Sequence, residues 1–214
     1  MAQIKSRNSR SYKRSRPIRP PYDRVLIVTE GSKTEINYFE EIRQTFRIPT
    51  AHVRVTPGRG TQPIQVVEYA IELFKGNPDF EKVFAVFDRD DFVSYHDAIM
   101  KAEATKLKLR NREKRQVLFE AVVSVPNFEV WFLMHFRNVT AWIHRDTVLR
   151  ELCQHIPTYA KGLKGIYTMV SERFPTAKAR AVQSRQHNTR LPGNAIYTDV
   201  DTLVDLLISL KLRS

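Results

Sequence analysis

The amino-acid sequence predicts an α/β fold, with a mainly parallel four-stranded sheet flanked by helices and a helical C-terminal part. Two observations support this class. Short apolar runs, which suit strands buried on both faces of a parallel sheet, alternate with segments of helical periodicity over the first two thirds of the chain. From about Arg145 onwards the patterns are helical, so the sheet is expected to be complete before that point.

The expected strands are three largely apolar runs at residues 24–29, 83–87 and 117–124 and a short second strand at residues 52–56. Between them, helical periodicity predicts helices over about residues 34–46, 63–75 and 94–110. Ser32 and Glu35 have the spacing of a capping box, so Glu35 is expected to cap the first helix, with metal contact as the alternative. The C-terminal helices are expected to break near residues 155–157 and 190–194, before a last helix over about 198–212.

Length and composition indicate one domain with a modest appendage. The expected divisions are a basic arm at residues 1–21, an α/β core at 22–137 and a helical part at 138–214 that packs on the core. No segment approaches the roughly 18 consecutive apolar residues of a membrane helix, and the N-terminus lacks the apolar region of a signal peptide. Cys153 is the only cysteine, which excludes internal disulfides and a zinc ribbon. The expected location is the cytoplasm.

A strong positive charge indicates a polyanionic partner. The formal net charge is +12 and the pI is about 10.0, so without membrane features nucleic acid is the first candidate. Residues 1–20 carry seven Lys or Arg and no acid, and they are expected to form a disordered arm that adds salt-dependent affinity for phosphate backbones. A second basic run, from Lys101 to Arg115, is either a solvated face or the flank of a nucleic-acid track.

Acidic residues follow two of the expected strands, where α/β sheets usually carry their chemistry. Glu30 ends the first strand, and Asp88, Asp90 and Asp91 follow the third. Parallel strands end at one edge of a sheet, and acids at i and i+2 on extended backbone point the same way and can share a cation. Carboxylate oxygens suit Mg²⁺ or Mn²⁺. An acidic loop that caps the next helix would explain the two aspartates at 88 and 90 equally well.

A further acid follows the fourth strand. Glu129 lies in the first turn of the next expected helix, for which Asn127 is a natural N-cap. The helix dipole favours an acid in that turn, which is one explanation for Glu129. The other explanation is that Glu129 joins the acids at the ends of the neighbouring strands.

The candidates for gripping a substrate are basic residues. Lys161 and Lys164 belong to a stretch between residues 161 and 190 in which seven Lys or Arg stand against one acid, and this stretch is expected to form a basic wall beside the acidic site. Arg59 lies between two glycines, which would let the backbone approach a phosphate, although a tight turn between strand and helix would need the same glycines.

Several motifs together resemble those of the RloB family. Glu30-Gly31 after one strand and Asp88-x-Asp90 after a later one resemble the Toprim signature of topoisomerases, bacterial primases and several nucleases. The fuller resemblance to RloB proteins rests on IVTEG with TEINYF in residues 27–39, on VFDRDD at 86–91 and on PNFEVW with HF in residues 126–136. It covers roughly residues 22–210.

This resemblance implies a Toprim-like, Rossmann-like fold, a divalent-metal site and a role in phage defence. RloB proteins tend to be encoded beside restriction–modification or abortive-infection genes, often with an ATPase partner. The resemblance gives the metal and acid roles to Glu30, Asp88 and Asp90, with Asp91 and Glu129 as family additions. The basic arm lies outside the shared region.

The function expected from sequence is a metal-dependent Toprim-type nuclease, with RNA favoured over DNA, that acts as the effector of an anti-phage or abortive-infection system. The alternatives are a non-catalytic nucleic-acid-binding regulatory subunit of an ATPase partner, a housekeeping RNA-processing ribonuclease, and a phosphatase with a DxD nucleophile. The phosphatase fits poorly, because its DxD normally ends the first strand and here that strand ends at Glu30.

Overall fold

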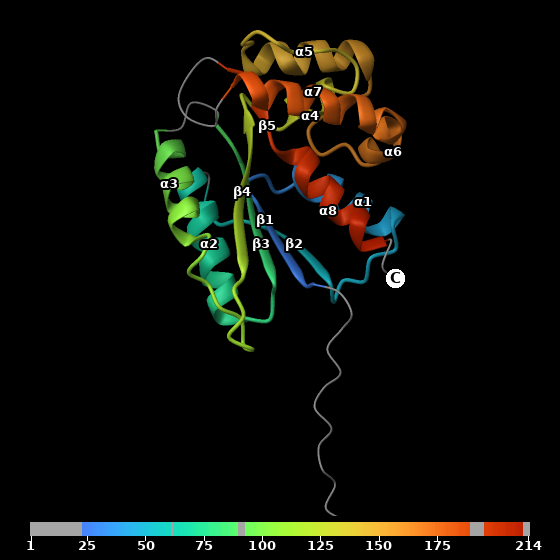
Figure 1. Cartoon of the computed structure of the whole chain (residues 1–214). Coiled ribbons are helices and arrows are strands. Elements are labelled where there is room, and N and C mark those ends of the chain that lie inside the picture. Colours follow the sequence, from blue (N-terminus) through green and yellow to red (C-terminus); the bar gives the residue numbers. More distant parts are fainter. Residues whose placement is uncertain (1–22, 61, 90–92, 189–194, 212–214) are drawn as a thin grey trace, which may run out of the picture.

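A five-stranded sheet forms the centre of the computed structural model, with strand order β2-β1-β3-β4-β5 (Figure 1). The structure describes residues 23–60, 62–89, 93–188 and 195–211, so the arm expected at 1–21 lies outside it. The first four strands pair in parallel, and the last pairs antiparallel with β4. The strands are β1 (Val25–Thr29), β2 (Val53–Pro57), β3 (Lys82–Asp88), β4 (Leu118–Val125) and β5 (Tyr197–Thr198).

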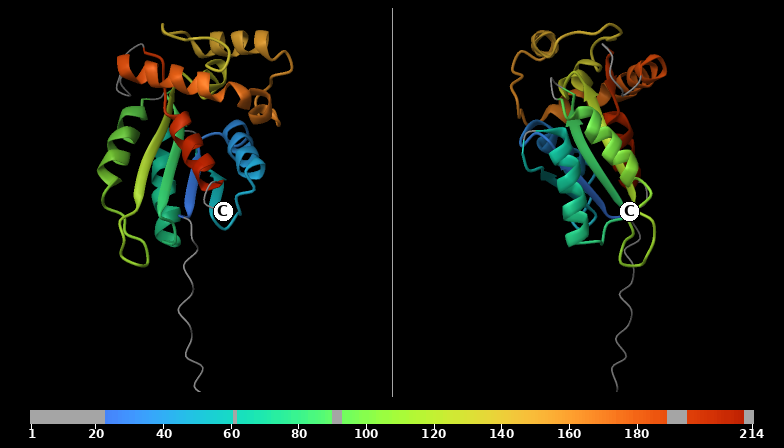
Figure 2. Two further views of the ribbon diagram at one scale, coloured as in Figure 1. Left: turned by 45° about the vertical axis from the view of Figure 1, so that its right-hand side comes forward. Right: turned by 90° about the vertical axis from the view of Figure 1, so that its left-hand side faces the viewer.

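Helices cover both faces of this sheet, which is why its central strands are apolar without alternation. Helices α2 (Pro63–Gly76) and α3 (Tyr95–Thr105) lie on one face, and α1 (Thr34–Thr45) and α8 (Val200–Lys211) lie on the other (Figures 1 and 2). Successive side chains of β1 serve the two cores in turn. Val25 and Ile27 pack on the α1 and α8 side, whereas Leu26 and Val28 pack on the α2 and α3 side.

The remaining helices form a layer at the end of the sheet where the parallel strands finish (Figure 2). This layer is joined to the core by buried polar contacts as well as apolar ones. The indole Nε1 of Trp131 donates to the hydroxyl of Tyr38 at 2.8 Å, and the Arg185 guanidinium forms an ion pair with the buried carboxylate of Asp201. The elements are α4 (Glu129–Leu133), α5 (Arg145–His155), α6 (Ile166–Val170), the 3₁₀ turn η1 (Ser171–Arg173) and α7 (Phe174–His187).

The expected fold class is confirmed: the sheet is mainly parallel, helices flank it, and the C-terminal part is helical. Two details differ. The sheet has a fifth strand, β5, which is only two residues long and therefore leaves no periodic pattern in the sequence. The third helix ends at Thr105 rather than near residue 110, because residues 106–116 turn back as a loop that bridges Arg110 to Gln116. No helix in the described ranges is long and apolar enough to cross a membrane.

The contact between Tyr38 and Trp131 gives a stability prediction. Both side chains are fully buried, so Tyr38→Phe leaves the indole N–H of Trp131 without an acceptor. We expect a loss of about 1–3 kcal/mol in the free energy of unfolding, measured by urea denaturation. Tyr69→Phe removes the same atom from a half-buried tyrosine on α2 and should change this free energy by less than about 0.5 kcal/mol. Equal losses in the two variants would contradict the assignment.

Candidate active site

Acidic side chains from β1, β3 and the start of α4 meet at the edge of the sheet where the parallel strands end. Glu30 directly follows β1, and its backbone N–H donates to the carbonyl of Val86 on β3 at 2.8 Å. The backbone N–H of Asp88, at the end of β3, donates in turn to Oε2 of Glu30 at 3.1 Å. The parallel pairing that the sequence predicts therefore makes Glu30 and Asp88 direct neighbours.

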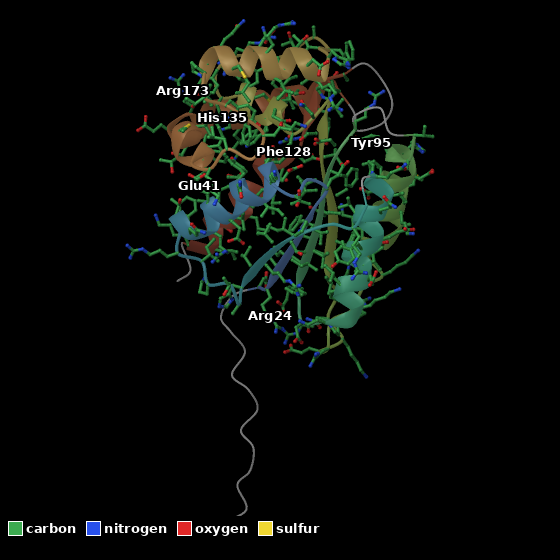
Figure 3. The ribbon with its side chains drawn as sticks, turned by 180° about the vertical axis from the view of Figure 1, so that it is seen from behind. Arg24, Glu41, Tyr95, Phe128, His135 and Arg173 are labelled. Carbon is green, nitrogen blue, oxygen red and sulfur yellow. The ribbon has the colours of Figure 1, made fainter. Side chains whose placement is uncertain are left out.

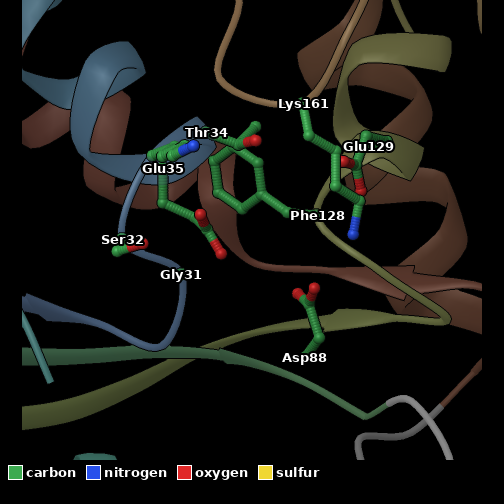
Figure 4. Close-up of a pocket in the computed structure, with 9 residues that line it drawn as sticks. Gly31, Ser32, Thr34, Glu35, Asp88, Phe128, Glu129 and Lys161 are labelled. Atoms are coloured by element: carbon green, nitrogen blue, oxygen red, sulfur yellow. The ribbon is translucent and has the colours of Figure 1, made fainter. Parts of the chain in front are cut away.

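A pocket of about 200 Å³ opens at this edge, and three carboxylates face it. In Figure 4 the side chains of Glu35 and Asp88 point towards the same space, and Glu129 lies across from them. Two lysines line the pocket as well, so its walls carry both signs of charge with an excess of acid. The lining residues are Gly31, Ser32, Lys33, Thr34, Glu35, Asp88, Phe128, Glu129 and Lys161.

The pocket contains Glu35, to which the sequence analysis gave a capping role. That expectation is wrong: α1 begins at Thr34 with Lys33 in the N-cap position, and no side chain caps it. The Glu35 carboxylate instead folds back over Gly31, where a Cβ atom would overlap it, and Glu35 is only 6% exposed. Its spacing from Ser32 suits a capping box, and sequence alone could not show that the side chain turns inward.

Burial and like charges raise the pKa of two of these acids. Burial is the main cause for Asp88, whose pKa lies well above its ordinary value, and the carboxylates of Glu35, Glu129 and Glu30 raise it further. Burial also raises the pKa of Glu35, with Glu129 adding to the effect, while hydrogen bonds to the backbone and the charge of Lys161 oppose it. The acids thus repel one another in a poorly solvated space, and a cation would relieve that repulsion.

Glu129 is held in place through both of its carboxylate oxygens. Nδ2 of Asn127 donates to Oε2 at 2.8 Å, and the hydroxyl of Tyr159 donates to Oε1 at 3.1 Å. Burial and the neighbouring charge of Glu129 raise the pKa of Tyr159, so this hydroxyl keeps its proton. Asn127 therefore fixes Glu129 rather than capping the helix, because Phe128 occupies the N-cap position. No sequence pattern points to Tyr159, which lies 30 residues away from Glu129 along the chain.

The segment that carries Tyr159 and Lys161 is tied to the start of α1. The amide of Asn37 donates to the carbonyl oxygen of Gly162 at 2.7 Å, and the backbone N–H of Gly162 donates to Oγ1 of Thr34 at 3.0 Å. Gly162 has φ +83°, in the left-handed region that favours glycine. A loop of the C-terminal helical part is thereby fixed at the mouth of the pocket, and it contributes Lys161 to the lining.

The structure places the other expected site residues elsewhere or does not describe them. Asp90 and Asp91 lie outside the described residues. Arg59 forms an ion pair with Glu72 at 3.3 Å and lies over the ring of Tyr69, so its side chain contacts α2 and does not line the pocket.

The basic wall expected between residues 161 and 190 does not line the pocket as a unit. Lys161 faces the pocket, and Lys164 is not among its lining residues. Lys178 and Arg185 instead form ion pairs with Asp205 and Asp201 of α8. Lys178 and Arg185 therefore use their charge in contacts with α8 rather than in the pocket.

The donor chemistry of the pocket suits a hard divalent cation. Oδ1 of Asp88 is buried and accepts no hydrogen bond from the described residues, and the surrounding acids supply further carboxylate oxygens. In the part of the chain that the structure describes, however, no three His, Cys, Asp or Glu side chains are grouped so as to hold an ion by themselves. The chemistry of Asp88 therefore fits a metal ligand, although the described acids alone do not form a complete site.

The comparisons with known proteins agree with the motifs on one point. A family model described as RloB-like protein matches residues 25–207, from the first residue of β1 to within α8, and so includes the whole sheet and the pocket. No curated protein and no solved structure matches the chain.

The raised pKa of Asp88 predicts how its removal changes stability with pH. The folded state holds the Asp88 proton more tightly than the unfolded chain does, where the pKa is about 3.9. The contribution of Asp88 to stability is therefore complete below about pH 4 and is lost as pH rises through the folded-state pKa. Asp88→Asn abolishes this loss and should stabilise the protein at pH 7 by about 0.5–2 kcal/mol, the usual range for a stabilising substitution.

Urea denaturation in the presence of EDTA, at pH 7 and at pH 3.5, measures this effect. The gain in stability should disappear at pH 3.5, where the protonated Asp88 of the wild type is as neutral as the asparagine that replaces it. Asp97→Asn, at an exposed acid in the first turn of α3, is the matched control and should give no gain at pH 7. A stabilisation by Asp88→Asn that is the same at both pH values would contradict the electrostatic cause.

Proposed function

The chain belongs to the RloB-like protein family, and we propose that it is a divalent-metal-dependent nuclease, with RNA favoured over DNA, that acts as the effector of an anti-phage or abortive-infection system. The observation that carries this proposal is the meeting of Glu30, Glu35, Asp88 and Glu129 at one edge of the sheet, in a chain of formal net charge +12. Family resemblance supports the defence role, a Toprim-like core and an ATPase partner.

An acidic pocket in a basic protein is difficult to explain as a surface that only binds. Three carboxylates line it against two lysines, so a phosphate brought there without a cation would be repelled. Burying acids next to one another also costs stability, as the raised pKa values of Asp88 and Glu35 indicate. In hydrolytic sites a bound metal ion offsets both the repulsion of phosphate and the repulsion between the acids. The acids are needed there because they hold the metal and orient or deprotonate water.

Each residue has a role in this proposal. Asp88 would hold Mg²⁺ or Mn²⁺ together with the sequence-predicted ligands Asp90 and Asp91, and the bound ion would supply Lewis acidity towards the scissile phosphate. Glu30, fixed against the backbone of Asp88, is the candidate to orient or deprotonate the attacking water.

Two further side chains at the mouth of the pocket complete the proposal. Glu129 presents a carboxylate that Asn127 and Tyr159 keep in one orientation. Lys161 would contact a phosphate oxygen of the substrate, because it lines the pocket beside the acids.

One observation favours a second candidate, a nucleic-acid-binding regulatory subunit of an ATPase partner. Within the described residues no complete set of three metal ligands is assembled, and a subunit that does not cleave would need none. The two candidates differ in whether metal binding and cleavage depend on the pocket acids.

The first test concerns the metal. Mg²⁺ or Mn²⁺ at about a hundredfold excess over its Kd should stabilise the wild-type protein by about 2.7 kcal/mol, seen as a rise in Tm. Asp88→Ala should abolish this rise, whereas Asp97→Ala, at an exposed acid on α3, should keep it. An equal rise in wild type and Asp88→Ala would show that the ion binds elsewhere.

The second test separates an enzyme from a regulator. Glu30→Gln keeps the side-chain volume and the acceptor for the Asp88 N–H, but removes the charge. Binding of nucleic acid should persist or improve, while metal-dependent cleavage by the complete system with its ATPase should fall by about 10²–10⁴-fold. Glu72→Gln, at an exposed acid on α2, should cleave at the wild-type rate. Cleavage by Glu30→Gln at the wild-type rate would overturn the nuclease assignment and favour the regulatory subunit.

A further inference from the structure

The excess positive charge of the chain is concentrated on two short segments. Of the formal net charge of +12, residues 1–20 contribute +7 and residues 106–116 contribute +5, so the rest of the chain carries equal numbers of acidic and basic residues. The second segment is named the basic loop, and it connects α3 to β4. Its cations are Lys106, Lys108, Arg110, Arg112, Lys114 and Arg115.

The basic loop is an ordered turn that is held by internal hydrogen bonds. Asn111 is buried beneath it, and its Oδ1 accepts from the backbone N–H groups of Glu113 and Arg115, both at 3.0 Å. The backbone N–H of Asn111 donates to the carbonyl of Arg115 at 2.9 Å, and Arg110 bridges to Gln116. The cations are therefore presented on a fixed frame, so little ordering entropy opposes binding there.

Three of the six cations remain available to a partner. Lys106 and Arg112 form ion pairs with Glu120 and Asp79, which anchor the loop to its surroundings, and Arg115 pairs with Glu113 inside the loop. Lys108, Arg110 and Lys114 are exposed, and none of them forms an ion pair with the residues that the structure describes.

The basic loop lies at the edge of the sheet opposite to the pocket. The backbone N–H of Arg112 donates to the carbonyl of Pro78 at 3.0 Å, just before β3 begins, and the neighbouring Arg24 precedes β1. Figure 3 shows Arg24 at this edge and Phe128, which lines the pocket, towards the other. The seven residues of β3 separate the two edges by about 20 Å, at roughly 3.3 Å per residue.

We propose that the basic loop is a second contact surface for nucleic acid, which holds the phosphate backbone of a long strand about 20 Å from the pocket. An unbalanced cluster of cations costs self-repulsion, whereas the chain outside residues 1–20 and the basic loop carries both signs in equal number. Exposed cations on a fixed frame suit a long polyanion of uniform charge.

A remote contact surface also answers a difficulty of the proposed nuclease. The pocket is lined by more acids than bases, so it contributes little net attraction for a strand of phosphates. Binding energy from parts of a substrate far from the reacting bond can bring that bond into the site. The role of the basic loop in substrate binding rests on the proposed nuclease function. The loop's affinity for nucleic acid, however, can be measured without any cleavage.

The experiment measures binding of the full chain to a single-stranded RNA of about 30 nucleotides, in EDTA, at several salt concentrations. The variant Lys108→Gln/Arg110→Gln/Lys114→Asn removes the three available cations, with Asn at position 114 because that residue has φ 61°. Each phosphate contact contributes about 0.7 to the slope of log affinity against log salt for a single strand, so the slope should fall by about 2.

The matched control removes three exposed cations elsewhere, Arg54→Gln/Lys75→Gln/Arg150→Gln, and should change this slope by less than about 0.7, one phosphate contact. Equal slopes in the two variants would overturn the proposal. The proposal would also fail if the loop variant lost affinity for polyglutamate but not for RNA, because the loop would then bind an acidic protein rather than nucleic acid. If the triple variant fails to fold, Lys108→Gln alone should lower the slope by about 0.7. Failure of cleavage with an intact loop effect would count against the nuclease and not against the loop.

Discussion

Repulsion between carboxylates that parallel strands bring to one edge is the constraint on which the rest of this structure depends. Pairing of β1 with β3 fixes Glu30 against Asp88 whatever their charges, and the start of α4 adds Glu129. Within the sheet, the backbone N–H of Asp88 offsets part of the charge of Glu30. The charge of Glu129 is offset by hydrogen bonds from the nearby Asn127 and from Tyr159, which lies 30 residues away along the chain. Lys33 and Lys161, which also line the pocket, add positive charge.

The C-terminal helical part therefore belongs to the site rather than being an addition to it. Tyr159 holds Glu129, Lys161 reaches the pocket, and Gly162 fastens their loop to α1 through two hydrogen bonds. Helix α4, which carries Glu129, is fastened to α1 in the apolar core, where Trp131 donates to Tyr38. A loss of packing between the layers would consequently reach the acids, because their orientation depends on the same helices.

Local pattern and parallel geometry explain what the sequence predicted. An apolar run followed by an acid is visible in the chain, and parallel pairing carries that acid to a known edge. The sequence therefore predicts that Glu30 and Asp88 are neighbours, and the hydrogen bond between them confirms this. The positions that sequence could not give depend on contacts between distant residues. Glu35 turns inward over Gly31 although its spacing suits a cap, and Tyr159 contacts Glu129 across 30 residues of sequence. The strand β5 is equally invisible, since two residues have no periodicity.

The separation of charge across the sheet has a physical consequence. At physiological ionic strength the Debye length is about 8 Å, so cations about 20 Å from the pocket are largely screened from its acids. The basic loop therefore neither pairs with the acids of the pocket nor lowers the pKa of Asp88, and these acids stay available to a divalent ion. Had the same cations stood beside the pocket, they would have neutralised it. Lys161 at the mouth then provides the local positive charge for a single phosphate, while the distant edge attracts the strand.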